Sequence, residues 1–116
     1  MPIAARWRSL SDLPAPRGRE AMPGVYEIAD GEKRTIYIGQ SARDVPNRLR
    51  QHLARSPCVS DAGRYWRYSY SRIPRAEEAR LLSQHQEAYG ELPRCNRAKP
   101  LERDARRRYA ERSSDE

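Results

Sequence analysis

Two short runs of strand-forming residues, close together in the chain, constrain the fold more than any other feature. Residues 24–29 read GVYEIA and residues 35–39 read TIYIG, and a polar connection that begins with Asp30 and Gly31 separates them. β-branched and aromatic residues favour extended backbone, and two such runs with a short polar link form an antiparallel hairpin. The sequence therefore predicts a β-hairpin in the first half of the chain.

Helical and strand-like patterns follow the hairpin. Asp44 is a good N-cap, and apolar residues recur every four positions behind it, so residues 44–55 are predicted to form an amphipathic helix. Bulky and polar residues largely alternate over 64–73, which predicts a third strand. A second helix is predicted over 75–89, with Gly90 placed to end it.

The order β-β-α-β-α with short links predicts an α+β fold, in which helices flank a three-stranded antiparallel sheet. Residues 1–23, rich in Pro and Arg, are expected to form an irregular N-terminal arm, and residues 24–97 the folded domain. Residues 98–116 are expected to form a basic C-terminal helix or tail. A chain of 116 residues has room for one domain with a modest core.

The chain is strongly basic, with a net charge of +7 and a pI near 9.9. Arginine carries nearly all of this charge, and its planar guanidinium can bind phosphate through two parallel hydrogen bonds. The charge balance therefore favours a polyanionic partner, although a basic surface that is only solvated has the same composition.

Cys58 and Cys95 lie far apart in the chain, and neither belongs to a CxxC or His-rich motif. We interpret them as incidental thiols of a protein in a reducing compartment, and we predict neither a disulfide nor a zinc site. Residues 1–10 contain no apolar run of the signal-peptide kind, and no stretch approaches the roughly 20 apolar residues of a membrane span. We therefore expect a soluble protein that is located in the cytoplasm.

Two tripeptides and the residues that follow them resemble a known family. GVY at 24–26 and YIG at 37–39 are similar to the paired signature of the GIY-YIG nucleases, which include homing endonucleases, some restriction enzymes and a domain of a bacterial excision-repair nuclease. Four later residues continue the resemblance in order, the last in a Pro-x-x-Asn segment: Arg48, His52, Glu78 and Asn96. The resemblance spans most of the chain and implies a nuclease active site on the α+β fold.

The resemblance also implies a role for each catalytic candidate. Tyr26 would activate or orient the attacking water, and Tyr37 would hydrogen-bond to the water or the phosphate. Arg48 would clamp the scissile phosphate through two hydrogen bonds, while His52 would polarise Tyr26 or contact a phosphate oxygen. Asn96 would order the active-site turn. Because a tyrosine with a pKa near ~10 is a poor base at neutral pH, a neighbouring cation has to assist it.

Five further residues are candidates for contacts with the substrate: Gly39, Gln40, Ser41, Arg64 and Arg67. Gly39 would permit a close approach of backbone and substrate. Arg64 and Arg67 lie among aromatic residues of the predicted third strand, a combination that suits phosphate contacts and base stacking. A strand that packs one face and points its arginines into solvent has the same pattern.

Glu78 is the candidate metal ligand. In the family, a glutamate on the second helix is the sole protein ligand of a divalent cation, Mg²⁺ or Mn²⁺, and hard cations of this kind prefer oxygen donors and keep several waters. Glu78 has apolar residues three and four positions later, which places it on the inward edge of the helix. Glu77 is the lesser candidate. Counting back from Pro93 by the spacing of some members gives Gln84 instead, which would mark a degenerate site.

Functions of different classes remain open. The first is a metal-dependent endonuclease that acts on nucleic acid, with DNA favoured over RNA. The alternative is a non-catalytic nucleic-acid-binding module that keeps the fold and the phosphate clamp, which the +7 charge and the longer spacing before Pro93 favour. A protein-interaction domain whose Arg-rich face docks an acidic partner is the third and weakest interpretation.

Overall fold

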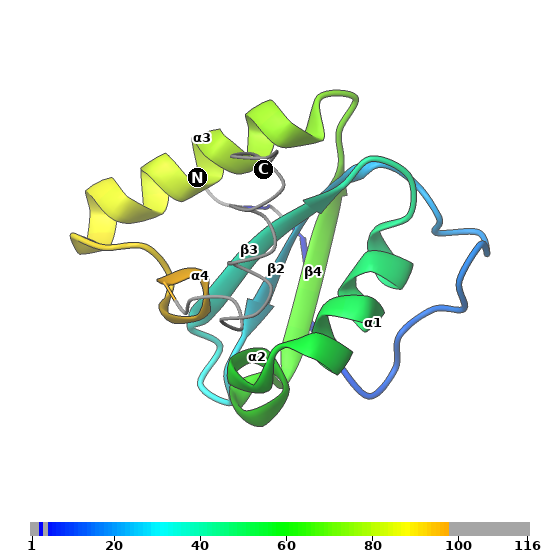
Figure 1. Cartoon of the computed structure of the whole chain (residues 1–116), viewed down its shortest axis with the longest axis horizontal. Coiled ribbons are helices and arrows are strands. Elements are labelled where there is room, and N and C mark those ends of the chain that lie inside the picture. Colours follow the sequence, from blue (N-terminus) through cyan, green and yellow to red (C-terminus); the bar gives the residue numbers. More distant parts are fainter. Residues whose placement is uncertain (1–2, 4, 98–116) are drawn as a thin grey trace, which may run out of the picture.

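The predicted hairpin is present in the computed structural model, which describes residue 3 and residues 5–97, and it supplies one inner strand and one edge strand of the sheet. β2 (Gly24–Ala29) pairs antiparallel with β3 (Thr35–Ser41), and its other edge pairs antiparallel with β4 (Tyr65–Tyr70). All of β2 is buried, because strands flank it on both sides and other elements pack against both faces of the sheet (Figure 1). The prediction of an α+β fold with an antiparallel sheet flanked by helices is confirmed.

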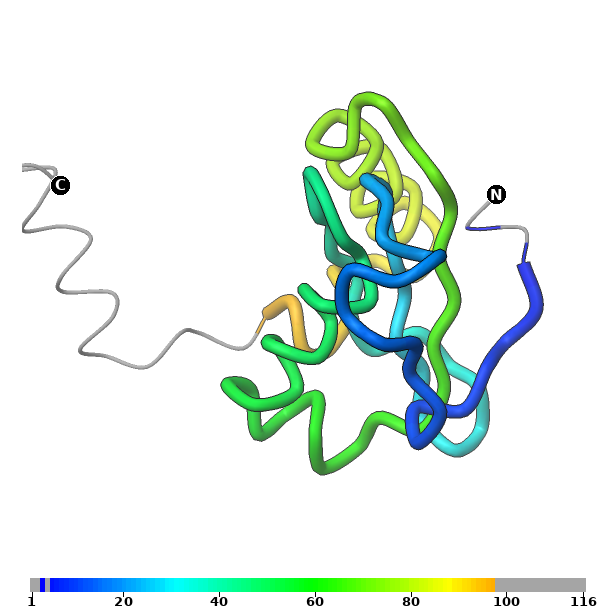
Figure 2. Tube along the Cα trace, turned by 90° about the vertical axis from the view of Figure 1, so that its right-hand side faces the viewer, coloured from blue at the N-terminus to red at the C-terminus, as the bar shows by residue number. Residues whose placement is uncertain are grey.

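The sheet has a fourth strand that the sequence did not predict. β1 (Arg8–Ser9) pairs antiparallel with the outer edge of β4, so the strand order is β1-β4-β2-β3. The Arg8 guanidinium lies 4.7 Å from the centre of the Trp66 ring and 2.7 Å from the carboxylate of Glu20, which also accepts a hydrogen bond from the Tyr68 hydroxyl. These contacts hold the N-terminal segment, blue in Figure 2, beside the sheet where an irregular arm was predicted.

The first predicted helix is present and is followed by a second that was not predicted. Asp44 is the N-cap of α1 (Val45–Arg55) and accepts a hydrogen bond from a first-turn N–H. Ser56 then ends α1 and caps α2 (Pro57–Ala62). Pro57 suits the first turn of a helix, because its missing N–H would have no partner inside the helix there.

α3 (Pro74–Tyr89) begins one residue before the predicted helix and ends at Gly90, whose φ of 83° lies in the left-handed region that favours glycine. α4 (Arg94–Arg97) is a short helix that packs against β3. The predicted basic helix or tail, residues 98–116, lies outside the described residues. No helix in the described part of the chain is long and apolar enough to cross a membrane.

Two clusters of buried side chains lie on opposite faces of the sheet. One cluster joins α1, α2 and α4 to the sheet, and its members are Tyr26, Ile28, Ile36, Val45, Leu49, Val59, Trp66 and Cys95. The other lies under α3, and its members are Ile3, Val25, Ile38 and Leu81. Neighbouring residues of β2 point to opposite faces, as the pleat of a strand requires. β3, at the edge of the sheet, therefore lies between the layer that contains α1 and the layer that contains α3 (Figure 1).

Arg67 occupies a structural position and not the substrate contact that its pattern suggested. Its Nε atom lies 2.6 Å from the carboxylate of Glu27, which is 1% exposed, and its guanidinium lies 3.9 Å from the centre of the Trp7 ring. A carboxylate removed from water needs a hydrogen-bonded cation. Burial raises the pKa of Glu27, and Arg67 opposes this rise.

Cys58 and Cys95 form a disulfide that joins α2 to α4, so the prediction of two free thiols is wrong. The two helices contribute to the same buried cluster, and the cysteines therefore meet although 37 positions separate them along the chain. The expectation of a reducing compartment rested on unpaired cysteines, and it loses that support.

Reduction of this disulfide is expected to lower the free energy of unfolding by about 2–4 kcal/mol, because the link restricts the unfolded chain. Urea denaturation with and without a dithiol reductant measures the difference. Thiol titration of denatured, unreduced protein should find no free cysteine. Two reactive thiols per chain in protein purified without reductant would contradict the pairing.

Candidate active site

Tyr26 and Tyr37 lie on neighbouring strands of the hairpin, with ring centres 6.1 Å apart. Tyr26 is 1% exposed, and burial raises the pKa of its hydroxyl far above the ordinary 10.0. Burial also raises the pKa of Tyr37. At both tyrosines the Glu78 carboxylate adds to the rise in pKa, and the Arg48 guanidinium opposes it. Both hydroxyls are therefore neutral at physiological pH and can donate hydrogen bonds.

Gly39, which pairs with Tyr26 in the strand register, leaves room for both tyrosine rings. A Cβ atom at this position would lie 2.6 Å from the Tyr26 hydroxyl oxygen and 2.7 Å from Cε2 of Tyr37. Such distances are shorter than side-chain contacts allow, so a larger residue would displace the rings. Gly39 was predicted to permit a close approach of substrate, and the structure shows that the two tyrosines already require a glycine there.

Gly39→Ala is expected to lower the free energy of unfolding by roughly 1–3 kcal/mol through overpacking. Any activity that needs both hydroxyls should fall by about tenfold or more, because small displacements of reacting groups are costly. Gly31→Ala is the matched control, since a Cβ atom there would meet only the Arg64 side chain at an ordinary 3.9 Å. Urea denaturation and near-ultraviolet circular dichroism compare the two, and equal stability of both variants would contradict the crowding.

His52 lies against the ring of Tyr37, with ring centres 4.2 Å apart and planes inclined by 25°. Burial lowers the pKa of His52, and the neighbouring Arg48 lowers it further, so the imidazole is neutral at physiological pH. Its Nε2 atom is buried and has no hydrogen-bond partner among the described residues. The structure therefore places His52 beside Tyr37 with one polar atom unused, and shows no hydrogen bond from it to Tyr26.

Glu78 lies near the start of α3 and is half-buried. Its carboxylate is close enough to Tyr26 and Tyr37 to raise the pKa of both, and it also lies near Arg48. Burial raises the pKa of Glu78, and Arg48 opposes the rise. Glu77 differs, because it forms an ion pair with Arg80 that lowers its pKa. The structure thus brings Glu78, and not Glu77, to the tyrosine pair.

Gln84, the residue that an alternative spacing would align with the metal ligand, lies elsewhere. It lines a small cavity of about 160 Å³ together with Glu27, Ile38 and Leu81. Ile38 and Leu81 belong to the cluster under α3, on the face of the sheet opposite Tyr26. The longer spacing before Pro93 therefore does not place Gln84 at the tyrosines.

Asn96 joins α4 to the exposed edge of β3. Its Oδ1 atom accepts a hydrogen bond from the Ile38 N–H at 2.8 Å, and its Nδ2 atom donates to the Ile38 carbonyl at 2.9 Å. A side-chain amide carries one acceptor and one donor group, so it can pair with an edge residue as a further strand would. Ile38 stands between Tyr37 and Gly39, and Asn96 consequently fixes the backbone that carries them.

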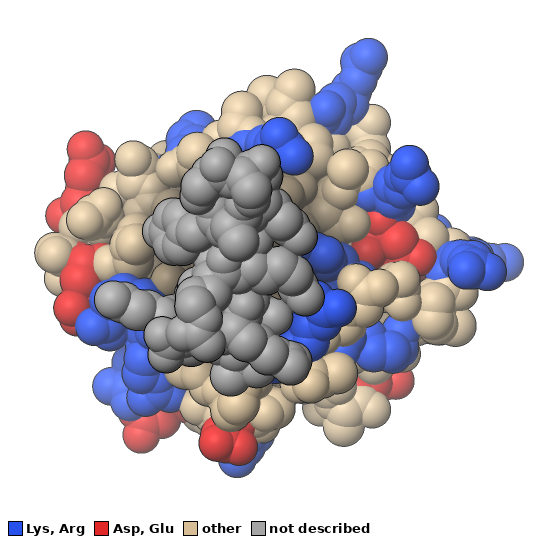
Figure 3. Space-filling view, in the orientation of Figure 1, with Lys and Arg blue, Asp and Glu red and all other residues tan. Residues whose placement is uncertain are grey.

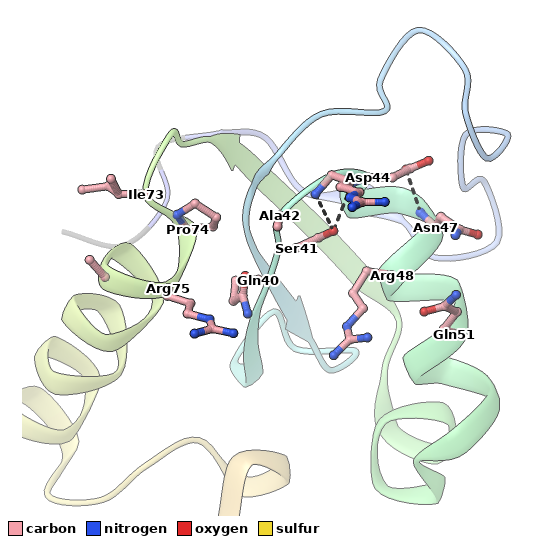
Figure 4. Close-up of a pocket in the computed structure, with 12 residues that line it drawn as sticks. Gln40, Ser41, Ala42, Asp44, Asn47, Arg48, Gln51, Ile73, Pro74 and Arg75 are labelled. Atoms are coloured by element: carbon pink, nitrogen blue, oxygen red, sulfur yellow. Dashed lines mark hydrogen bonds between the residues drawn. The ribbon is translucent and has the colours of Figure 1, made fainter.

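A cleft of about 730 Å³ opens beside this group, between the first turns of α1 and α3 and over the end of β3 (Figure 4). Three arginines line it, Arg43, Arg48 and Arg75, against one acidic residue, Asp44. In Figure 3, basic side chains occur at several places around the visible part of this face, with acidic ones among them. The excess of positive charge inside the cleft is therefore more informative than the mixed charge of the surrounding surface.

Gln40 and Ser41, both predicted to contact substrate, line the cleft at the end of β3. The Ser41 hydroxyl oxygen accepts hydrogen bonds from the N–H groups of Arg43 and Asp44, and so shapes the turn that leads into α1. The Gln40 Oε1 atom is buried without a hydrogen-bond partner among the described residues.

The structure does not bring Arg64 to the cleft. Its guanidinium donates hydrogen bonds to the backbone carbonyls of Asp61 and Gly63, next to the start of β4. The cleft lies at the opposite end of the sheet, where Gly24 pairs with both Ser41 and Tyr70. Arg64 is therefore remote from the candidate active site, whereas Arg67 is held by Glu27, which points to the face of the sheet opposite Tyr26.

The lining of the cleft also includes residues that were not predicted to belong to the site, among them Asn47, Gln51 and Arg75. Asn47 and Gln51 are one turn apart on α1, next to Arg48, and share its side of the helix. Arg75 precedes Glu78 by three positions, which places both on one side of α3. These helical spacings were the signal that could have identified them.

Comparison with known proteins gives one match. The family model described as the GIY-YIG catalytic domain matches residues 22–79, which is half of the chain. The matched segment includes the tyrosine pair, Arg48, His52 and Glu78, whereas Asn96 lies beyond it. Neither a curated protein nor a solved structure matches the chain significantly.

Proposed function

The chain belongs to the GIY-YIG family, and on this premise we propose that it is a metal-dependent endonuclease that hydrolyses phosphodiester bonds in nucleic acid, with DNA the favoured substrate. The observation that supports this most is the convergence of the tyrosine pair, Arg48 and Glu78 beside a basic cleft. Phosphodiester hydrolysis needs a positioned water and groups that neutralise charge on the phosphate, and these residues can supply both.

Each residue of the group has a distinct part in the proposed reaction. Arg48 binds two oxygens of the scissile phosphate through its guanidinium. Tyr26, which is neutral because of its burial, orients the attacking water by hydrogen bonding, and Tyr37 holds the water or the phosphate. His52 keeps the Tyr37 ring in place by stacking on it. Asn96 holds the strand that presents Tyr37.

A divalent cation, Mg²⁺ or Mn²⁺, fits the chemistry of Glu78. The pKa of its carboxyl group is raised in spite of Arg48, so its negative charge is incompletely compensated. The described residues contain no group of three or more metal-ligating side chains, so Glu78 and several waters would hold the cation, as hard cations allow. Such a cation, when bound, supplies charge neutralisation at the phosphate.

Cleavage of supercoiled plasmid tests the proposal. The protein should nick the plasmid with Mg²⁺ or Mn²⁺ and not with EDTA. Arg48→Ala should reduce the rate by about 10²-fold, the typical loss when one group that stabilises the transition state is removed. Arg34→Ala is the control, because it removes the same charge from an exposed side chain that pairs with Asp30 and Glu32. Arg34 precedes the first residue of β3, at the end of the strand away from the cleft. Its replacement should leave the rate within about twofold.

Two results would count against the proposal. Equal nicking in EDTA would exclude the metal-dependent reaction, and equal activity of the two arginine variants would remove Arg48 from the site. Salt-sensitive binding of DNA without cleavage of plasmid, branched DNA or RNA would favour the alternative, a non-catalytic binding module.

A further inference from the structure

Arg75 occupies the wall of the cleft that faces Arg48. Figure 4 shows the two side chains reaching into the same space, Arg48 from α1 and Arg75 from α3, with Gln40 of β3 between them. Arg75 is exposed, and it forms no ion pair with any residue in the described part of the chain. A free guanidinium in a basic cleft is able to bind an anion.

The two arginines lie on opposite walls of the cleft, Arg48 on α1 and Arg75 on α3. Arg48 acts on the pKa values of Tyr26, Tyr37 and Glu78, so its guanidinium belongs to the group around the tyrosines. Arg75 reaches into the cleft from the α3 wall, opposite Arg48 and with Gln40 between them. An anion bound by Arg75 would be a different one from the anion bound beside the tyrosines.

The backbone around Arg75 is also suited to negative charge. Ile73 precedes α3 without a side-chain cap, and Pro74 in the first turn has no N–H. The N–H groups of Arg75 and Ala76 are left at the positive end of the helix dipole, in the lining of the cleft. These N–H groups would supply further hydrogen-bond donors for an anion, beside the guanidinium of Arg75, the only charged side chain that α3 contributes to the lining.

We propose that Arg75 is a substrate-positioning residue that binds a phosphate next to the scissile one on the same strand, while Arg48 binds the scissile phosphate. The substrate is then held at two points, so that the strand crosses the cleft from α1 to α3. This inference rests on the proposed function, and it assigns Arg75 to binding of the nucleic acid and not to the reacting centre.

Two measurements on Arg75→Ala test the assignment. Fluorescence anisotropy with a short labelled DNA in EDTA reports binding without cleavage. Arg75→Ala should weaken binding by about tenfold, and the slope of log K against log salt should become shallower by about one, as expected for the loss of one phosphate contact. Arg75→Lys, which keeps the charge, should restore most of the slope, and Arg34→Ala should leave affinity within about twofold.

Steady-state cleavage separates positioning from catalysis. Arg75→Ala should raise KM by about tenfold and leave kcat within about threefold, whereas Arg48→Ala lowers kcat. Unchanged affinity and salt slope in Arg75→Ala would overturn the proposal, and so would a fall in kcat as large as that of Arg48→Ala. The binding measurement needs no activity, so a protein that fails to cut would contradict the proposed function and still test Arg75.

Discussion

Replacement of Glu78 by Gln is expected to remove metal-dependent cleavage, with a fall in rate of about 10³-fold or more. A cation that stabilises the transition state contributes several kcal/mol, and each 1.4 kcal/mol is roughly tenfold in rate. The substitution keeps the volume of the side chain and removes the charge that a hard cation prefers. Plasmid nicking with Mg²⁺ or Mn²⁺ measures the loss.

Glu77→Gln is the matched control for this variant, because it makes the same chemical change at the next residue. Glu77 is paired with Arg80 and does not influence either tyrosine, so its replacement should leave the rate within about twofold. Undiminished cleavage by Glu78→Gln would remove this residue from the metal site. Equal loss in both variants would mean that the start of α3 matters through its overall charge and not through one ligand.

The pH dependence of cleavage gives an independent view of Glu78. Its pKa lies above the ordinary 4.5, because burial outweighs the effect of Arg48. Protonation below that pKa neutralises the carboxylate and displaces the cation, so at a low Mg²⁺ concentration activity should fall as the pH decreases, in a limb that lies above pH 4.5. More Mg²⁺ should move this limb to lower pH. A limb that does not respond to the metal concentration would belong to another group.

Local patterns in the sequence were sufficient for most of the elements. The alternation and turn residues around 24–39 predict the hairpin, Asp44 marks the start of α1, and Gly90 marks the end of α3. Each of these features depends on residues that are neighbours in the chain, so the sequence contains the whole signal. The candidate catalytic residues followed from the family resemblance, and in the fold Glu78 lies close enough to both tyrosines to act on their pKa values.

The errors concern contacts between segments that are distant in the chain. The meeting of Cys58 and Cys95 depends on how α2 and α4 pack on the sheet, and no spacing rule describes that packing. The pairing of β1 with β4 depends in the same way on where the N-terminal segment crosses. The structural role of Arg67 could have been predicted, because Glu27 is a lone acidic residue within an apolar strand. A buried carboxylate of this kind requires a cation beside it.

Arg67→Met is expected to lower the free energy of unfolding by about 3–5 kcal/mol at pH 7, the usual effect of leaving one partner of a buried ion pair uncompensated. Glu27, at 1% exposure, would lose its ion-pair partner, while Met keeps much of the volume that packs against Trp7. Urea denaturation measures the change. Arg8→Met is the comparison, since the Arg8–Glu20 pair is partly exposed and its loss should be worth about 1 kcal/mol or less.

A double variant distinguishes lost charge compensation from lost packing. Glu27→Met combined with Arg67→Met replaces both charges by apolar groups of similar size, and stability should return to within about 1–2 kcal/mol of the natural protein. If the double variant were as unstable as Arg67→Met alone, the effect would lie in the contact of Arg67 with Trp7 and not in the buried carboxylate.

The instability of Arg67→Met should also depend on pH, with a sign that follows from Glu27. Burial already raises the pKa of Glu27 above 4.5, and loss of Arg67 removes the main influence that opposes the rise. Between 4.5 and the raised pKa the folded state then holds a proton that the unfolded state has released, so stability falls as the pH rises through this window. Below it both states are protonated, and the penalty should largely disappear because a neutral carboxyl group is buried at lower cost. A loss of stability that is the same at pH 4 and pH 7 would show that the charge of Glu27 is not its cause.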